Sequence, residues 1–278
     1  MGLIAALIAT ALCSVVYVRM IRWEVPEPIS KKQAAIPAVL GLLSVFLATM
    51  LMIGFGAGIK ALFGSVSEAV SSLVLRSLVS SFFLAGFTEE VVKLLMFLAT
   101  IKIVKPKNVY EYGLLCAGVG FGFTALEEFI YSGSSPVAMV LRIFFFAMHV
   151  VFGLLMGLHL GLAKDCRLQG RGGAGKHVFL ALFLPVLWHT LFDAATTSNA
   201  AFNSDDESVK IAGAVIALIV CAASIAGQII LLVRFKKNTQ AYCAMRLIAP
   251  EDAAAPVTED AADAAPRLPE DEDPGIRR

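Results

Sequence analysis

The sequence predicts an all-α membrane protein, a polytopic transmembrane helical bundle of about seven spans. Hydrophobic residues make up 58% of the 278 residues, and charged residues only 16%. The mean hydropathy is +0.78, whereas a soluble domain of this length needs a far more polar surface. Several apolar stretches also reach about 18 residues, the length that crosses the hydrocarbon core of a bilayer. The chain is therefore expected to lie in the lipid bilayer, and no nucleic-acid partner is expected.

Seven apolar stretches mark the expected spans, which are about 2–19, 36–59, 78–103, 109–131, 137–163, 177–197 and 209–233. No basic residue precedes the first stretch, so we expect it to be retained as a span and not cleaved as a signal peptide. Clusters of Lys and Arg follow the first, third, fifth and seventh spans. Because positively charged loops stay in the cytoplasm, we expect the N-terminus outside and the C-terminus in the cytoplasm.

Two further segments complete the expected organisation. Residues 64–77 alternate apolar residues with serines and a lone Arg76, which predicts an amphipathic helix on the outer surface that joins the third span at a bend near Gly86. Residues 249–278 are rich in Ala, Pro and acidic residues, a composition typical of a disordered tail. A membrane domain over 1–248 is therefore expected to precede an acidic cytoplasmic tail.

Ionisable side chains occur inside four consecutive spans, which is rare because charge at membrane depth is costly. At a rise of 1.5 Å per residue, Glu89, Glu127, His149, His189 and Asp193 all fall roughly 18–27 Å from the cytoplasmic ends of their spans. Neighbouring spans run in opposite directions, so chance would scatter these depths. The sequence therefore predicts one buried polar layer on the outer side of the midplane.

The third span carries three charged residues in the stretch FTEEVVK. Glu89 and Glu90 are about 100° apart on a helix, so we expect one to face the site and the other to face a partner such as Lys93. Arg142 is expected to act as a counter-ion to one of the glutamates. Two positions stay open for Glu128, one in the site and one facing water.

Three glycines follow His149 in the fifth span, at 153, 157 and 161. With Arg142 and His149 they share one face of the expected helix. Small residues at this spacing let another backbone approach closely. The face is therefore predicted to accept another helix or an extended peptide.

The polar groups support hydrolysis by either of two routes. Two histidines and a carboxylate can bind a divalent ion such as zinc and leave a position for water, whose proton a further carboxylate takes. Without a metal, a glutamate and a histidine activate water directly, while His189 and Asp193 polarise the carbonyl. Buried acidic and imidazole groups also build proton relays, so a proton- or cation-coupled transporter stays an alternative. It is less favoured because no internal repeat is found.

Four motifs resemble, in chain order, those of the PrsW family of bacterial intramembrane proteases: EEVVK at 89–93, FTALE at 123–127, the histidine at 149 and HTLFD at 189–193. The resemblance covers about residues 85–195. It implies a membrane-embedded protease of the bacterial cytoplasmic membrane that cleaves a single-pass membrane protein, an anti-sigma factor, near the outer side. A non-catalytic membrane scaffold of the same fold stays an alternative. The expected site residues are Glu89, Glu90, Lys93, Glu127, His149, His189 and Asp193.

Members of this family are often called metalloproteases, so the resemblance makes zinc the expected cofactor. The expected ligands are Glu127, His149 and His189. Glu89 is then the base for the bound water, and Asp193 orients His189. A metal-free version, in which Glu89 and Glu127 activate water, stays open.

Overall fold

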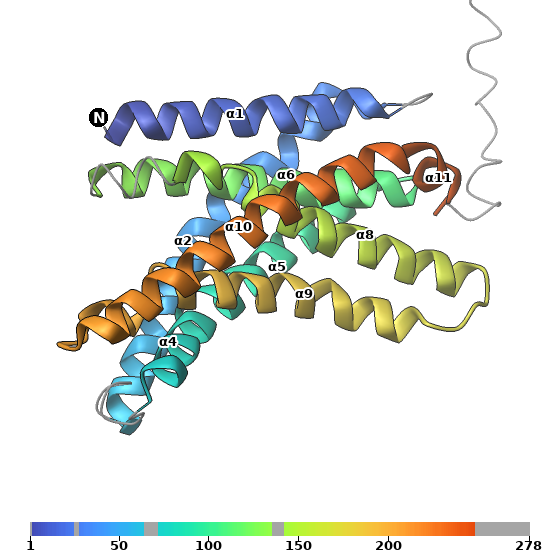
Figure 1. Cartoon of the computed structure of the whole chain (residues 1–278). Helices are drawn as coiled ribbons and strands as arrows, with labels where there is room; N and C mark the ends of the chain where they lie inside the picture. Colours follow the sequence, from blue (N-terminus) through green and yellow to red (C-terminus); the bar gives the residue numbers. More distant parts are fainter. Residues whose placement is uncertain (1, 25–27, 64–71, 135–141, 248–278) are drawn as a thin grey trace, which may run out of the picture. The chain divides into compact units, whose positions relative to one another are not determined.

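The structure is a computed structural model, and its helices account for most of the residues that it describes (Figure 1). The described residues are 2–24, 28–63, 72–134 and 142–247. The expected tail at 249–278 lies outside them, as do residues 64–71 of the predicted surface helix. The prediction of an all-α fold is confirmed for the described part of the chain.

Within the described ranges, six helices, some of them with the residues that adjoin them, are long and apolar enough to cross a membrane. They are α1 (Gly2–Trp23), α2 (Lys31–Phe63), α6 (Val109–Ile130), α8 (Met148–Leu168), α9 (Ala174–Ala195) and α10 (Glu207–Lys237). Short elements complete the fold, namely η2 (Tyr131–Gly133), η3 (Ala200–Asn203) and α11 (Thr239–Ala244). Several helices extend past the expected spans, because a helix continues into charged residues where the apolar stretch ends.

The third expected span is a longer helical run made of three elements. These are α4 (Leu73–Ser81), η1 (Phe82–Gly86) and α5 (Phe87–Val104). At Gly86, where the sequence predicts a bend, the structure has the end of η1, a π-helical turn. Such a turn holds an extra residue and occurs frequently at functional sites. It lies directly before Glu89 and Glu90 and so determines which way they face.

Backbone signals explain where α5 and α6 end and begin. Lys105 adopts a left-handed conformation with φ of 54°, and its N–H donates to the carbonyl of Ile101 at 3.1 Å, which ends α5. Asn108 begins α6 because its side chain accepts a hydrogen bond of 2.8 Å from the backbone N–H of Glu111. The connection between the two helices is therefore short, and both must pack as neighbours.

Glycines allow α6 and α8 to pack closely. A Cβ atom on Gly157 would lie 2.2 Å from the carbonyl oxygen of Tyr112, and one on Gly153 would also collide with α6. The glycine face predicted for the fifth span is therefore filled by another helix. On α6, a Cβ atom on Gly120 would lie 2.0 Å from the carbonyl oxygen of His149. The same packing thus holds the start of α8, and His149 with it, against α6.

A further glycine brings α9 against the helical run that carries the glutamates. A Cβ atom on Gly86 would lie 2.3 Å from Oγ1 of Thr190 and 3.0 Å from its backbone nitrogen. Any larger residue would therefore push the two elements apart. Because His189 precedes Thr190, this close approach places its imidazole beside the first turn of α5.

Candidate active site

Lys93 lies at the centre of a buried cluster of charged side chains. Its ammonium nitrogen is 2.8 Å from Oε1 of Glu90 and 3.3 Å from Oε2 of Glu89. Lys93 is 1% exposed and Glu90 is fully buried. The expectation that only one of the two glutamates would face the lysine is wrong for a physical reason. The long lysine side chain reaches both residues, which lie three and four positions before it on one helix.

His149 connects Lys93 to the next glutamate. Its Nδ1 is 2.8 Å from the ammonium nitrogen of Lys93, and its Nε2 is 2.7 Å from Oε2 of Glu127. An ammonium group only donates hydrogen bonds, so Nδ1 must accept. The proton of the neutral ring then lies on Nε2 and is donated to Glu127. The contacts therefore assign the tautomer of His149.

Arg142 pairs with Glu127 of the second motif and with Glu128, which follows it. Its Nη2 is 3.2 Å from Oε2 of Glu127 and 3.0 Å from Oε1 of Glu128, and its Nε also donates to Glu128. The predicted role of Arg142 as a counter-ion is confirmed. Of the two positions left open for Glu128, the structure has the buried one, because Glu128 is 3% exposed.

His189 lies between three carboxylates. Its Nδ1 is 2.9 Å from Oε1 of Glu90, which makes Glu90 the partner that orients the ring. Its Nε2 is 3.7 Å from Oδ2 of Asp193 and 3.9 Å from Oε2 of Glu89. These two distances are longer than a direct hydrogen bond, so Nε2 has no direct hydrogen-bond partner among the three carboxylates.

Aromatic rings enclose the polar groups. The ammonium nitrogen of Lys93 is 3.8 Å from the centroid of the Phe123 ring, a distance at which the cation and the ring attract each other. The ring of Phe152 lies 5.3 Å from that of His189, centroid to centroid. Apolar walls lower the local dielectric constant, which strengthens each charge–charge contact inside them.

All seven predicted site residues meet in this cluster, namely Glu89, Glu90, Lys93, Glu127, His149, His189 and Asp193. They come from α5, α6, α8 and α9, which contribute one predicted motif each. Their roles in catalysis stay predictions.

Four of the cluster's side chains offer a donor set suited to a metal ion. One ligand atom from each of Glu89, Glu90, His149 and His189 lies within 4.8 Å of the others. Imidazole nitrogens and carboxylate oxygens are common zinc ligands. In addition, Oε2 of Glu90 is buried without a hydrogen-bond partner among the described residues. The side chains present therefore fit a divalent ion.

The ligand set expected from the resemblance, Glu127 with His149 and His189, overlaps this group in its two histidines. Glu127 joins the group from the far side of His149, where its carboxylate holds Nε2. A glutamate in that position orients an imidazole whose other nitrogen faces the centre. Which carboxylate binds a metal stays a prediction.

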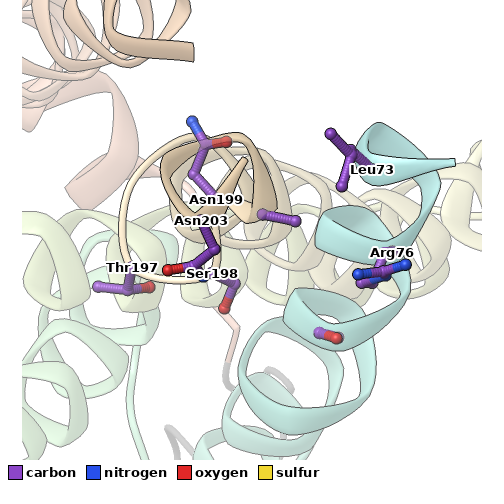
Figure 2. A pocket seen from close by; sticks show the side chains of 8 residues that line it. Leu73, Arg76, Thr197, Ser198, Asn199 and Asn203 are labelled. Atoms are coloured by element: carbon purple, nitrogen blue, oxygen red, sulfur yellow. The ribbon is translucent and has the colours of Figure 1, made fainter. Parts of the chain in front are cut away.

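A polar hollow of about 340 Å³ lies between α4 and the segment that follows α9 (Figure 2). Thr197 and Ser198 line it, one turn beyond Asp193. The backbone N–H of Ser198 donates to the carbonyl of Asp193 at 2.8 Å. On the opposite wall, Arg76 and Ser80 of α4 complete the lining. The hollow thus adjoins the end of the helix that carries His189 and Asp193.

Two features of the molecule escape the sequence reasoning. His159 and His177 are not among the predicted site residues, and their Nδ1 atoms lie 3.0 Å apart. The hairpin of α8 and α9 makes them neighbours, and only the exact register of that hairpin could have shown it. The second feature is Thr190, whose Oγ1 has no hydrogen-bond partner among the described residues because Gly86 packs against it.

The chain is similar to known proteins over the part that holds the cluster. The model of a family described as "PrsW family intramembrane metalloprotease" matches residues 37–225. A relative named "Protease PrsW" from Halalkalibacterium halodurans is 31% identical over 120 residues, which are 42% of this chain and 54% of the relative. A second "Protease PrsW", from Oceanobacillus iheyensis, is 25% identical over 127 residues, 45% of this chain and 57% of the relative.

The chain thus spans about half the length of the curated relatives it matches. No solved structure matches it. The similarity therefore concerns the helices around the cluster.

Proposed function

The chain belongs to the PrsW family, and from that premise we propose that it is an intramembrane endopeptidase. It hydrolyses a peptide bond of a membrane-anchored protein near the outer side of the bilayer. The observation that carries this proposal is the convergence of carboxylates on the imidazole of His189, with Nδ1 2.9 Å from Glu90 and Nε2 within 3.9 Å of both Glu89 and Asp193. An imidazole held in this way is suited to proton transfer and to stabilising an oxyanion.

Glu89 is the base in this proposal. Its only short side-chain contact among the described residues is the hydrogen bond of 3.3 Å from Lys93, so one carboxylate oxygen is left for a water molecule. Glu89 takes a proton from that water as the water oxygen attacks the carbonyl carbon of the scissile bond. The proton then passes to the leaving nitrogen, the C–N bond breaks, and a carboxyl and an amino terminus result.

His189 and its partners stabilise the negative charge that develops on the carbonyl oxygen. Nε2 of His189 lies on the side of the ring away from Glu90 and donates to that oxygen. Glu90 and Asp193 are positioning residues that keep the ring protonated and aimed. Lys93 compensates the charge of Glu89 and Glu90, so that two carboxylates can remain adjacent in a buried site.

A divalent ion, zinc, fits the same centre. Glu90, His149 and His189, three of the four side chains whose donor atoms lie within 4.8 Å of one another, would hold it, and a bound ion would polarise the carbonyl and lower the pKa of a bound water. The family description as a metalloprotease supports this cofactor. In the residue chemistry given above, Glu89 remains the group that accepts the proton.

The proposed substrate is a single-pass membrane protein, an anti-sigma factor, in the cell membrane of a bacterium. The motif resemblance supports this substrate class, and the polar hollow beside Asp193 (Figure 2) offers hydroxyl and amide groups to an extended segment. Hydrolysis at the cluster would cut such a segment close to where it leaves the bilayer.

The test compares new protein N-termini, labelled and identified by mass spectrometry, in membranes of cells with and without the chain. We expect N-termini that depend on the chain and that map within or beside the span of single-pass proteins. If the two membranes have the same N-termini, the chain does not cleave such proteins, and the non-catalytic scaffold becomes the better reading.

A further inference from the structure

A second cavity, of about 450 Å³, lies between α8 and the end of α10. It shares no lining residue with the cluster around Lys93. Phe235 of α10 and five leucines from the two helices form its apolar part. Most of the leucines are half-buried: Leu154, Leu155, Leu158, Leu162 and Leu231. From Leu154 to Leu162 this leucine wall extends about 12 Å along α8. Its length suits a hydrocarbon chain.

Polar side chains form the other part of the cavity. On α8, His159 follows the first leucines; on α10, Arg234 follows Leu231, and Asn238 comes directly after the helix. Tyr242 of α11 adds a hydroxyl group. The cavity therefore has an apolar part and a polar part, which is the pattern of an amphipathic ligand.

The charge of the polar part is positive. Arg234 is exposed, and its guanidinium forms no ion pair or hydrogen bond within the described part of the chain. No carboxylate lines the cavity. Lys236 and Lys237 add further positive charge in the last turn of α10. A guanidinium donates hydrogen bonds in a fork that matches phosphate oxygens.

We propose that this cavity is a binding site for one anionic phospholipid of the surrounding membrane. Its phosphate binds Arg234, with the Tyr242 hydroxyl and the Asn238 amide beside it, and one acyl chain lies along the leucine wall. Basic pockets between transmembrane helices bind acidic lipid headgroups in this way. The lipid fills the space between α8 and α10, a helix whose side chains are otherwise mostly exposed. The site does not depend on the proposed proteolysis.

The test is a titration of the purified, delipidated chain with phosphatidylglycerol, followed by native mass spectrometry. We expect one tightly bound lipid per chain. Arg234→Gln should weaken its binding about tenfold, because the charge-assisted hydrogen bond to the phosphate is lost. Leu231→Trp, which fills the apolar part without changing any charge, should weaken binding as well. The melting temperature of each variant shows that it is folded.

Lys237→Gln is the matched control, since it removes the same charge from the same turn of α10 but from a side chain that does not line the cavity. It should bind phosphatidylglycerol as the unchanged protein does. Equal losses for Arg234→Gln and Lys237→Gln would overturn the proposal in favour of diffuse surface attraction. Equally tight binding of phosphatidylcholine, or of inorganic phosphate alone, would overturn it too, because either result removes the need for an anionic lipid.

Discussion

The ammonium nitrogen of Lys93 lies 2.8 Å from Nδ1 of His149. It also lies 2.8 Å from Oε1 of Glu90. Both atoms belong to side chains that could hold a metal ion. An internal cation therefore contacts two of the side chains that a divalent ion would need, so we expect the two cations to compete.

Replacing Lys93 tests that competition. Lys93→Met keeps the apolar stem of the side chain but removes the ammonium group, so Glu90 and His149 become free to bind a metal. We expect zinc to bind this variant at least about tenfold more tightly than the unchanged protein, because a buried charged hydrogen bond of roughly 1.5–3 kcal/mol no longer has to be broken. Titration with zinc, followed by metal analysis of the protein, measures this.

His149→Ala provides the opposite case, because it removes a metal ligand and should abolish the binding of one metal ion per chain. A zinc affinity of Lys93→Met equal to that of the unchanged protein would show that Lys93 and the metal occupy separate places. If the carboxylates of the unchanged protein work without metal, strong chelators should leave its activity intact.

Close packing of α6 and α8 gives a prediction about stability. Gly157→Ala places a methyl group 2.2 Å from the carbonyl oxygen of Tyr112, so backbones must separate at a cost of about 1–3 kcal/mol. The melting temperature in detergent should fall. Gly56→Ala is the control, because no atom of the residues that the structure describes lies within 4 Å of its Cβ position. A melting temperature of Gly157→Ala that matches this control would show that the helices are less tightly packed.

Much of this arrangement could be predicted from the sequence. The expected layer of ionisable groups is confirmed as one cluster, because helical rise alone sets the depth of residues such as His149 and His189. The approach of α6 to α8 follows from the glycine spacing. The contact of Glu90 with His189, and the contact of Lys93 with both glutamates, could not be predicted. They depend on the π-helical turn at Phe82–Gly86 and on the reach of Lys93, which tertiary packing determines.

The buried carboxyl of Glu24 should make the stability of the protein depend on pH. Glu24 follows α1, outside the membrane-spanning helices. Burial raises the pKa of its carboxyl above the usual range. Hydrogen bonds from the backbone of Ile29 and the side chain of Asn108 lower this pKa, but by less than burial raises it. The folded state therefore keeps this proton at pH values where the unfolded chain has lost it. Stability should fall as the pH rises from the usual pKa of a glutamate to the raised one.

Glu24→Gln removes this proton equilibrium and keeps a side chain of the same shape. The melting temperature of the variant should accordingly change less across that pH window than that of the unchanged protein. The same slope in both proteins would assign the pH dependence to other groups.

The distribution of basic residues predicts the orientation in the membrane. A cysteine introduced at Ser204, in the acidic loop before α10, should react with an impermeant maleimide added to intact cells. A cysteine at Gly172, in the basic connection between α8 and α9, should not. Labelling at position 172 in intact cells would mean that the positive loops face outward and that the assigned orientation is inverted.

Oxygen-18 incorporation by the reconstituted protein tests whether the cluster hydrolyses a peptide bond with Glu89 as the base. The chain and a single-pass anti-sigma factor are placed in liposomes in oxygen-18 water, and the products are analysed by mass spectrometry. We expect one oxygen-18 atom in the new C-terminus and loss of cleavage in Glu89→Gln. Glu24→Gln is the control and should cleave normally, because Glu24 is a buried glutamate outside the cluster. Undiminished cleavage by a folded Glu89→Gln protein would exclude Glu89 as the base.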